Sequence, residues 1–161
     1  MQRLLTIGAY GFTAAAFFEA LRGAGVDTFI DVRQRRGVRG REYAFVNAGR
    51  LQARLAKIGI RYRHIKELAP TTEVRAVQHR VDADLGTRKR NRSRLATEFA
   101  AAYRRVCLDT YPRSRFLDAV GPQAETVCLF CVEREPEACH RSLVAEHVRP
   151  AEVMSVEHLV P

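Results

Sequence analysis

The chain has 161 residues, 47% of them hydrophobic and 28% charged, which predicts one folded domain and excludes a low-complexity or membrane-spanning protein. Its formal net charge of +9 comes almost entirely from arginine, with 24 Arg against 3 Lys. Because arginine binds phosphate and carboxylate groups through paired N–H donors, this charge favours an anionic partner such as a nucleotide or nucleic acid, although solubility alone would also account for it.

The predicted elements alternate between strands and helices from the start of the chain. Leu4–Ile7 is a first strand, and Thr13 then caps a helix that ends at Gly23 and Gly25. A second strand follows at Thr28–Val32. The inward face of the helix is expected to hold Ala14, Phe17, Phe18 and Leu21.

The second quarter of the chain repeats this order. After a basic loop from Gln34 to Val46, Asn47 is predicted to cap a helix that stops at Gly59. Ile60–Ile65 alternates between apolar and polar residues, as a strand does. The apolar residues of the helix recur at helical spacing: Leu51, Leu55 and Ile58.

The polar middle of the chain predicts helices over Glu73–Leu85, from Ser93 onward and over Arg113–Val120. Ser93 is the expected cap of the second of these. The apolar face of that helix is expected to comprise Leu95, Phe99, Tyr103 and Val106.

The last third reads as a strand at Val127–Cys131, a helix with Pro136 in its first turn, and a final strand near Glu152–His158. The whole order predicts a single α/β domain over residues 1–161, with a mostly parallel sheet of about five strands flanked by helices. The inward residues of the last helix are expected to be Leu143, Val144, His147 and Val148.

Cysteine usage predicts a cytoplasmic location. The four cysteines lack the spacing of a small disulfide-bonded domain, which indicates a reducing compartment. The uncharged stretch Leu4–Phe18 behind Arg3 loosely imitates a signal peptide, but a strand, a turn and a helix account for it better.

Most of the chemistry lies in the eleven residues from Cys131 to Arg141, which hold two thiols, an imidazole, three carboxylates and two guanidiniums. They follow the carboxyl end of a strand, where ligands bind in open α/β sheets. Cys131 or Cys139 could serve as a nucleophile or redox centre, since His140 and Arg141 favour a thiolate. The alternative is that both thiols are buried hydrophobic residues.

Glu133 and His140 are candidates for an acid and a base, although an ion pair with Arg141 and a helix-start hydrogen bond would explain them equally well. A zinc site would need both thiols of Cys128-x-x-Cys131 together with the next two ligands. Strand alternation places Cys128 on the opposite face, in the core, and adjacent ligands such as Cys139 and His140 should diverge on a helix. We therefore expect no metal and no cofactor.

Further candidates lie in other loops. Asp31 and Arg33 end the second strand and should project beside the Cys131 loop, either toward a ligand or as a structural pair. The Gly8-Ala9-Tyr10-Gly11 turn lets backbone amides approach an anion. Two basic runs suit nucleic-acid backbones, or are simply solvated. They are Arg33, Arg35, Arg36, Arg39 and Arg41, and then Arg88, Lys89, Arg90, Arg92 and Arg94.

Several segments together carry a family resemblance over nearly the whole chain. They are Thr6-Ile7-Gly8, Asp31-Val32-Arg33, Asn47 with Leu51 and Leu55, Gly59 through Glu67-Leu68, and Cys131-x-Glu133-x-x-Pro136-x-x-Cys139-His140-Arg141. This set resembles the bacterial and archaeal family catalogued as domain of unknown function 488. The resemblance implies an α/β fold with one pocket and no established activity. It implies that the matching polar residues, such as Asp31, Arg33 and Arg141, lie near that pocket. We predict that the substrate-binding residues are Gly8, Tyr10, Asp31, Arg33, Asn47 and Arg141.

The chain departs from that family pattern in its loops. It has Ala9-Tyr10 where members commonly have His-Ser, and Ala69-Pro70 where glycines are usual. Gln34 to Gly37 replaces a Pro and Ser-Arg, which makes this chain the more basic variant. A looser similarity to rhodanese-type sulfurtransferases, through Asp31-Val32-Arg33 and a helix opening at Arg141-Ser142, is an analogy for sulfur chemistry.

These features predict an enzyme that acts on an anionic substrate, a nucleotide or nucleic acid, at the carboxyl end of the sheet. Its catalytic candidates are Cys131, Glu133, Cys139 and His140. Two alternatives stay open: a non-enzymatic DNA- or RNA-binding module that uses loops 33–41 and 88–94, and a thiol-based sulfur or redox protein.

Overall fold

The computed structural model describes residues 1–88, 91–153 and 155–161, and its centre is one five-stranded sheet with the order β3-β2-β4-β1-β5. Every pairing in the sheet is parallel, which confirms the predicted α/β fold. The strands are β1 (Arg3–Ile7), β2 (Thr28–Asp31), β3 (Arg61–His64), β4 (Thr126–Phe130) and β5 (Val156–Leu159).

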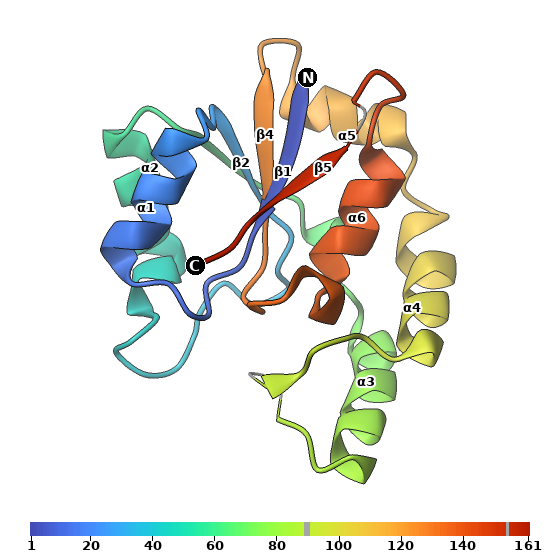
Figure 1. Ribbon diagram of the computed structural model, residues 1–161. Helices are drawn as coiled ribbons and strands as arrows, with labels where there is room; N and C mark the ends of the chain where they lie inside the picture. Colours follow the sequence, from blue (N-terminus) through green and yellow to red (C-terminus); the bar gives the residue numbers. More distant parts are fainter. Residues whose placement is uncertain (89–90, 154) are drawn as a thin grey trace.

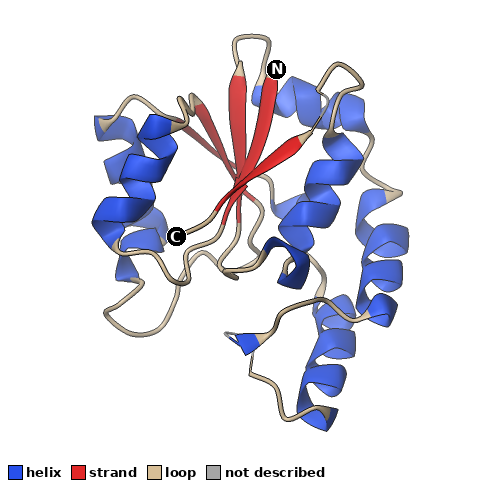
Figure 2. Ribbon diagram, in the orientation of Figure 1, coloured by secondary structure: helices blue, strands red, loops and turns tan. Residues whose placement is uncertain are grey.

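Helices cover both faces of the sheet (Figures 1 and 2). α1 (Ala14–Gly23) and α2 (Ala48–Lys57) lie on one face, and α5 (Arg113–Val120) and α6 (His140–Val148) lie on the other. The central strands β2 and β4 are therefore buried along their whole length, which explains why they are continuous apolar runs. The edge strands β3 and β5 are partly exposed.

Helix α1 forms where the sequence predicts it. The Thr13 hydroxyl accepts a hydrogen bond from the amide of Ala16 at 3.2 Å, as an N-cap does. Phe17 is fully buried, with its ring centroid 5.7 Å from that of Phe130 on β4. Ala14 was expected to face inward, but it is exposed because it lies in the first turn, on the solvent side of Phe17.

The predicted cap at Ser93 is wrong. Helix α4 covers Thr97–Tyr103 and begins after Ala96, whose side chain makes no capping bond. Tertiary hydrogen bonds hold the chain before it in an extended form: the Leu95 amide donates to the Glu137 carbonyl at 2.9 Å, and the Ala96 amide to the Gln78 side chain at 2.9 Å.

After α4 the chain makes a π-helical turn at Arg104–Leu108, which changes the angular spacing of the side chains. Val106 was expected on the apolar face and is 42% exposed as a result. The helix predicted in the polar stretch before α4 is present as α3 (Thr72–Asp84), which packs against α4 beyond the carboxyl edge of the sheet (Figure 1).

The segment after β4 also differs from its prediction. Pro136 begins a separate 3-10 turn, Pro136–Ala138, and Cys139 is extended before α6 starts at His140. The final strand begins at Val156, later than predicted, and Met154 within the predicted span lies outside the described residues. Along the described ranges, no helix combines the length and apolar character needed to cross a bilayer.

The topology places three loops around one crevice. The loops after β1 and β2 lead to helices on one face, whereas the loop after β4, which lies between these strands, leads to α6 on the other (Figure 1). Adjacent strands whose connections diverge in this way leave a crevice at their carboxyl ends, and ligands bind there in open α/β sheets.

Asp27 ties the start of β2 to the start of β4. Its carboxylate accepts hydrogen bonds from the amides of Glu125 at 2.9 Å and Thr126 at 2.6 Å, and from the Thr28 hydroxyl at 2.5 Å. Burial alone would raise the pKa of Asp27, but the bonds from Thr126, Thr28 and Glu125 outweigh it and hold the pKa below the ordinary 3.8.

We expect Asp27→Ala to lower the free energy of unfolding by about 1–2 kcal/mol at neutral pH, after allowance for partial solvent exposure. Because the folded-state pKa is depressed, this contribution is present above the unfolded pKa and disappears as the pH falls through the folded value. Urea unfolding at neutral pH and at a pH below the folded-state pKa of Asp27 measures this contribution. The control is Asp118→Ala, on the exposed face of α5. An equal loss at both pH values would contradict this assignment.

Candidate active site

A carboxylate bridges two thiols at the floor of the crevice. Glu133 Oε2 accepts hydrogen bonds from Cys131 Sγ at 3.1 Å and from Cys139 Sγ at 3.0 Å. All three residues are buried, Cys139 almost completely. Cys131 and Glu133 come from the loop that follows β4, while Cys139 reaches the same carboxylate from the end of that loop. The sequence-predicted catalytic residues are thus brought together.

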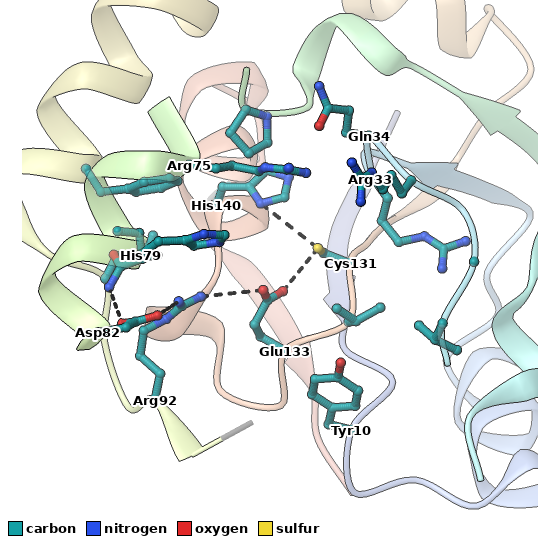
Figure 3. Close-up of a pocket in the computed structure, with 18 of the residues that line it drawn as sticks. Tyr10, Arg33, Gln34, Arg75, His79, Asp82, Arg92, Cys131, Glu133 and His140 are labelled. Carbon is teal, nitrogen blue, oxygen red and sulfur yellow. Dashed lines mark hydrogen bonds and ion pairs between the residues drawn. The ribbon is translucent and has the colours of Figure 1, made fainter. Parts of the chain in front are cut away.

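The imidazole of His140 completes the cluster. Its Nε2 lies 3.1 Å from the carbonyl oxygen of Val32, which can only accept, so Nε2 carries a proton and donates it. Nδ1 therefore faces the thiols and lies 4.0 Å from both Cys131 Sγ and Cys139 Sγ (Figure 3). The ring is further held edge-on by Tyr103, at 5.5 Å between centroids.

The surroundings shift the pKa values of the Cys139 and Cys128 thiols in opposite directions. Burial and the negative charge of Glu133 raise the pKa of Cys139, but its hydrogen bonds with Cys131 and His140 and the positive charge of Arg141 outweigh them and lower the pKa. Cys128 lies in the core of the sheet, where full burial raises the pKa of its thiol far above the ordinary range. Of these two thiols, the one in the cluster therefore loses its proton more readily.

One argument against a metal site proves wrong. Cys139 and His140 were expected to diverge on a helix, but Cys139 is extended and precedes α6, so both side chains point to the same place. The metal-binding atoms of Cys131, Cys139 and His140 lie within 4.8 Å of one another. Cys128 is outside this group, as strand alternation predicted.

Arg141 holds the loop in place. Its fully buried guanidinium donates through Nη1 to the Glu133 carbonyl, through Nη2 to the Arg134 carbonyl at 2.9 Å, and through Nε to the Thr6 hydroxyl at 3.3 Å. The resemblance implied a ligand-binding role for Arg141, but it is not among the residues that line the pocket. In this structure it acts on the backbone that carries Glu133.

Asp31 and Arg33 form a buried bidentate pair. Arg33 Nε and Nη2 donate to the two carboxylate oxygens of Asp31 at 2.9 and 2.7 Å, and the Tyr62 hydroxyl donates to Asp31 at 2.8 Å. The guanidinium lies over the ring of Phe130, 4.6 Å from its centroid. Arg33 Nη1 is buried and has no hydrogen-bond partner among the described residues.

The cluster opens into a cavity of about 420 Å³ between the loop after β2 and the helices α3 and α4 (Figure 3). Cys131, Glu133 and His140 are at its floor. Tyr10 and Phe99 supply aromatic surface to its walls. The walls also carry five guanidiniums, those of Arg33, Arg35, Arg39, Arg75 and Arg92.

Sequence reasoning missed the wall that α3 contributes. Arg92 donates to Asp82 at 2.9 Å and to Glu133 Oε1 at 3.5 Å, and it also donates to the Ala138 carbonyl at 2.9 Å. Gln78 donates to the same Asp82 at 2.7 Å. A usable signal existed: Arg75, Gln78 or His79, and Asp82 recur at helical spacing and form one polar stripe.

The remaining predicted residues occupy varied positions. Tyr10 lines the pocket and packs edge-on against Tyr43 at 5.0 Å between centroids. Asn47 stands at the start of α2 but makes no cap; its Oδ1 accepts from the Val38 amide at 2.7 Å and closes the loop. Arg36 is half-buried beside Tyr62, and Lys89 and Arg90 lie outside the described residues. The exposed predicted basic residues are Arg35, Arg39, Arg41, Arg88 and Arg94.

Comparison with known families gives one result. The model of the family described as domain of unknown function DUF488 matches residues 13–148, a span that includes β2, β4 and the whole Cys131–Arg141 loop. The chain belongs to this family. The resemblance seen in its sequence motifs is thereby confirmed, and DUF488 membership brings no activity with it. No curated protein and no solved structure matches the chain.

Gly8 allows β1 to approach the Glu133 loop. A Cβ on Gly8 would overlap the backbone carbonyl of Glu133 and come within 3.2 Å of the Arg141 guanidinium. We expect Gly8→Ala to lower the free energy of unfolding by about 1–3 kcal/mol, because backbone atoms cannot rotate away as a side chain would. Thermal and urea unfolding measure the loss.

The matched control is Gly23→Ala in α1, where an added Cβ meets nothing within 4 Å. It should be neutral or stabilising by up to about 1 kcal/mol. If both alanine variants behave alike, the close approach at Gly8 is unimportant.

Proposed function

We propose that this protein is an enzyme that acts on a small, anionic, nucleotide-sized substrate in the pocket above Cys131. The observation that carries the proposal is the meeting of two kinds of groups in one cavity. The walls carry two guanidinium nitrogens with no hydrogen-bond partner in the described part of the chain, and the floor holds a thiol, a carboxylate and an imidazole. The donors would bind the anion, and the floor would supply the chemistry.

Two buried nitrogens support an anionic ligand. Arg33 Nη1 and Arg75 Nε have no hydrogen-bond partner among the described residues, and both side chains line the pocket. A buried N–H donor without a hydrogen bond costs about 1–3 kcal/mol, and an anion in the pocket would remove this cost. In Figure 3, Arg75 lies beside His140 and faces Arg33 across the cavity. A phosphate between them would satisfy both.

The size of the cavity and its aromatic walls favour a nucleotide over a bare anion. A volume of about 420 Å³ falls in the range of small-molecule sites. Tyr10 and Phe99 on its walls offer surfaces on which a base can stack. Arginine, rather than lysine, suits the two-point recognition of phosphate oxygens.

The floor offers acid–base chemistry next to the bound anion. Glu133 contacts both thiols, and His140 Nδ1 faces them, so a proton can pass between a reacting group and the cluster.

We therefore expect Glu133→Gln to keep anion binding and lose turnover of the bound nucleotide, measured by chromatography of substrate and product. The proposal extends to a cytoplasmic location, because the four cysteines lack the spacing of a disulfide-bonded domain.

Binding is the sharpest test. We expect Arg75→Ala to weaken binding of nucleoside mono- and diphosphates by about 10- to 100-fold, the cost of one charge-assisted hydrogen bond of about 1.5–3 kcal/mol. Arg80→Ala, an exposed arginine on the same helix α3, should bind like the wild type. Calorimetric titration measures both. No binding to the wild type at millimolar nucleotide, or equal weakening in both variants, would refute the proposal.

A second candidate function is nucleic-acid binding at the mouth of the pocket, favoured by the exposed side chains of Arg35, Arg39 and Arg41 along one loop. Three phosphate contacts would give a slope of about −2.7 in log affinity against log salt concentration. We expect Arg41→Ala to make that slope shallower by about one unit, whereas Arg50→Ala on α2 should leave it unchanged. Fluorescence anisotropy with double-stranded DNA measures the slopes, and identical slopes for all three proteins would exclude this candidate.

A further inference from the structure

We propose that Cys131, Cys139 and His140 bind a zinc ion at the floor of the pocket, with the Glu133 carboxylate in the fourth position. Zinc in proteins is held by thiolate, imidazole and carboxylate groups in tetrahedral sites, and the cluster offers all three types. This inference concerns what the cluster holds, and its metal-binding test is independent of the substrate proposed above.

The distances between the ligand atoms are close to those of a tetrahedral zinc site. Zinc–sulfur bonds of about 2.3 Å and zinc–nitrogen or zinc–oxygen bonds of about 2.0–2.2 Å place neighbouring ligand atoms about 3.4–3.8 Å apart. In the cluster, Glu133 Oε2 lies 3.0 and 3.1 Å from the two sulfurs, and His140 Nδ1 lies 4.0 Å from each. Shifts of about 0.5 Å, within rotamer wells, would complete the site.

The imidazole is already oriented as a ligand. Metal-binding histidines donate their other N–H to a carbonyl or carboxylate, which fixes the ring and directs the free nitrogen to the metal. His140 does this through Nε2 and the Val32 carbonyl at 3.1 Å, and its Nδ1 faces the sulfurs. The backbone that carries Cys139 is equally fixed, because Arg92 donates to the Ala138 carbonyl at 2.9 Å.

Charge balance favours a bound cation over four unmetallated groups. Two thiols and a carboxylate within 3.1 Å cannot all ionise in a buried site unless a cation joins them. With a divalent ion, two thiolates and one carboxylate carry a net charge of −1. The buried guanidiniums of Arg141 and Arg92 lie next to this charge, and Arg141 has no ion-pair partner among the described residues. The soft sulfur donors select zinc rather than magnesium or calcium.

The position of the site indicates a catalytic rather than a structural ion. Cys131, Glu133 and His140 line the pocket, so the ion would lie within reach of a bound ligand. The second oxygen of Glu133 is 3.5 Å from Arg92, a partner to which the carboxylate can turn when water or substrate takes its place. Three protein ligands and one exchangeable position are the arrangement of catalytic zinc, which activates water or polarises a phosphoryl oxygen. Only this catalytic role of the ion rests on the proposed function; the binding of the ion does not.

The test uses the full-length protein, purified without chelators and measured by plasma mass spectrometry, then stripped and titrated with Zn²⁺ and with Co²⁺. We expect one zinc per chain, and a Co²⁺ complex with sulfur-to-metal charge-transfer absorption in the near ultraviolet. Cys131→Ser and Cys139→Ser should each weaken Zn²⁺ binding by more than about 100-fold, beyond the roughly 10- to 100-fold cost of losing a residue that only supports a ligand.

Cys107→Ser is the matched control, because Cys107 is buried outside the metal-binding group and a hydroxyl can keep its contact with the Ala69 carbonyl. It should bind Zn²⁺ like the wild type. Glu133→Gln keeps three ligands, so it should still bind Co²⁺ with an altered visible spectrum, and it guards against loss of binding through misfolding. Circular dichroism checks the fold of each variant.

Three outcomes would overturn the proposal. The first is no Zn²⁺ or Co²⁺ bound by the folded wild type. The second is binding that survives in both cysteine variants. The third is a disulfide between Cys131 and Cys139, seen as two rather than four titratable thiols in the denatured wild type purified without reductant. Zinc binding without nucleotide binding would support this site while refuting the proposed substrate.

Discussion

The buried guanidinium of Arg141 is the contact on which the candidate site depends. It reaches back from the first turn of α6 to two carbonyls of the loop after β4 and to Thr6 on β1. A fully buried charge is costly unless every donor is used and a counter-charge lies nearby. Each of its three nitrogens donates a hydrogen bond, and the carboxylate of the cluster supplies the nearby counter-charge. The guanidinium thus couples the path of the loop to the charge of the site, and Gly8 leaves the space that this packing needs.

The pocket has its floor at the carboxyl ends of the sheet strands and its wall in α3 and the loop segment that follows α3. The floor comes from the carboxyl ends of β2 and β4, which the parallel sheet brings side by side. The wall comes from α3 and the segment that leads into α4, joined to the floor by Arg92. Because Arg92 contacts Asp82, Glu133 and the Ala138 carbonyl, the wall and the acidic group at the floor form one hydrogen-bonded unit.

The parts that sequence reasoning could predict are those governed by local chemistry. Apolar runs marked the buried strands, Thr13 marked a helix start, and the motif from Cys131 to Arg141 marked the site. It failed where distant contacts overrode local preference. Ser93 does not cap a helix because Gln78 and Glu137 bind the following backbone. The convergence of Cys139 and His140 depends on an extended residue between two helical turns, which no spacing in the sequence reveals.

Hydrogen bonds on both sides of its tip hold the base of the loop after β2. Arg33 Nη2 donates to the Val46 carbonyl at 3.0 Å, and the Val38 amide donates to Asn47 at 2.7 Å, so the base of the loop is cross-linked by hydrogen bonds on either side of its tip. We expect a change in length or sequence at residues 39–42 to leave these two hydrogen bonds, and with them the position of Arg33, unchanged. Under the proposed function, the arginines at the tip of the loop could therefore be exchanged to alter substrate preference without displacing the groups at the floor of the pocket.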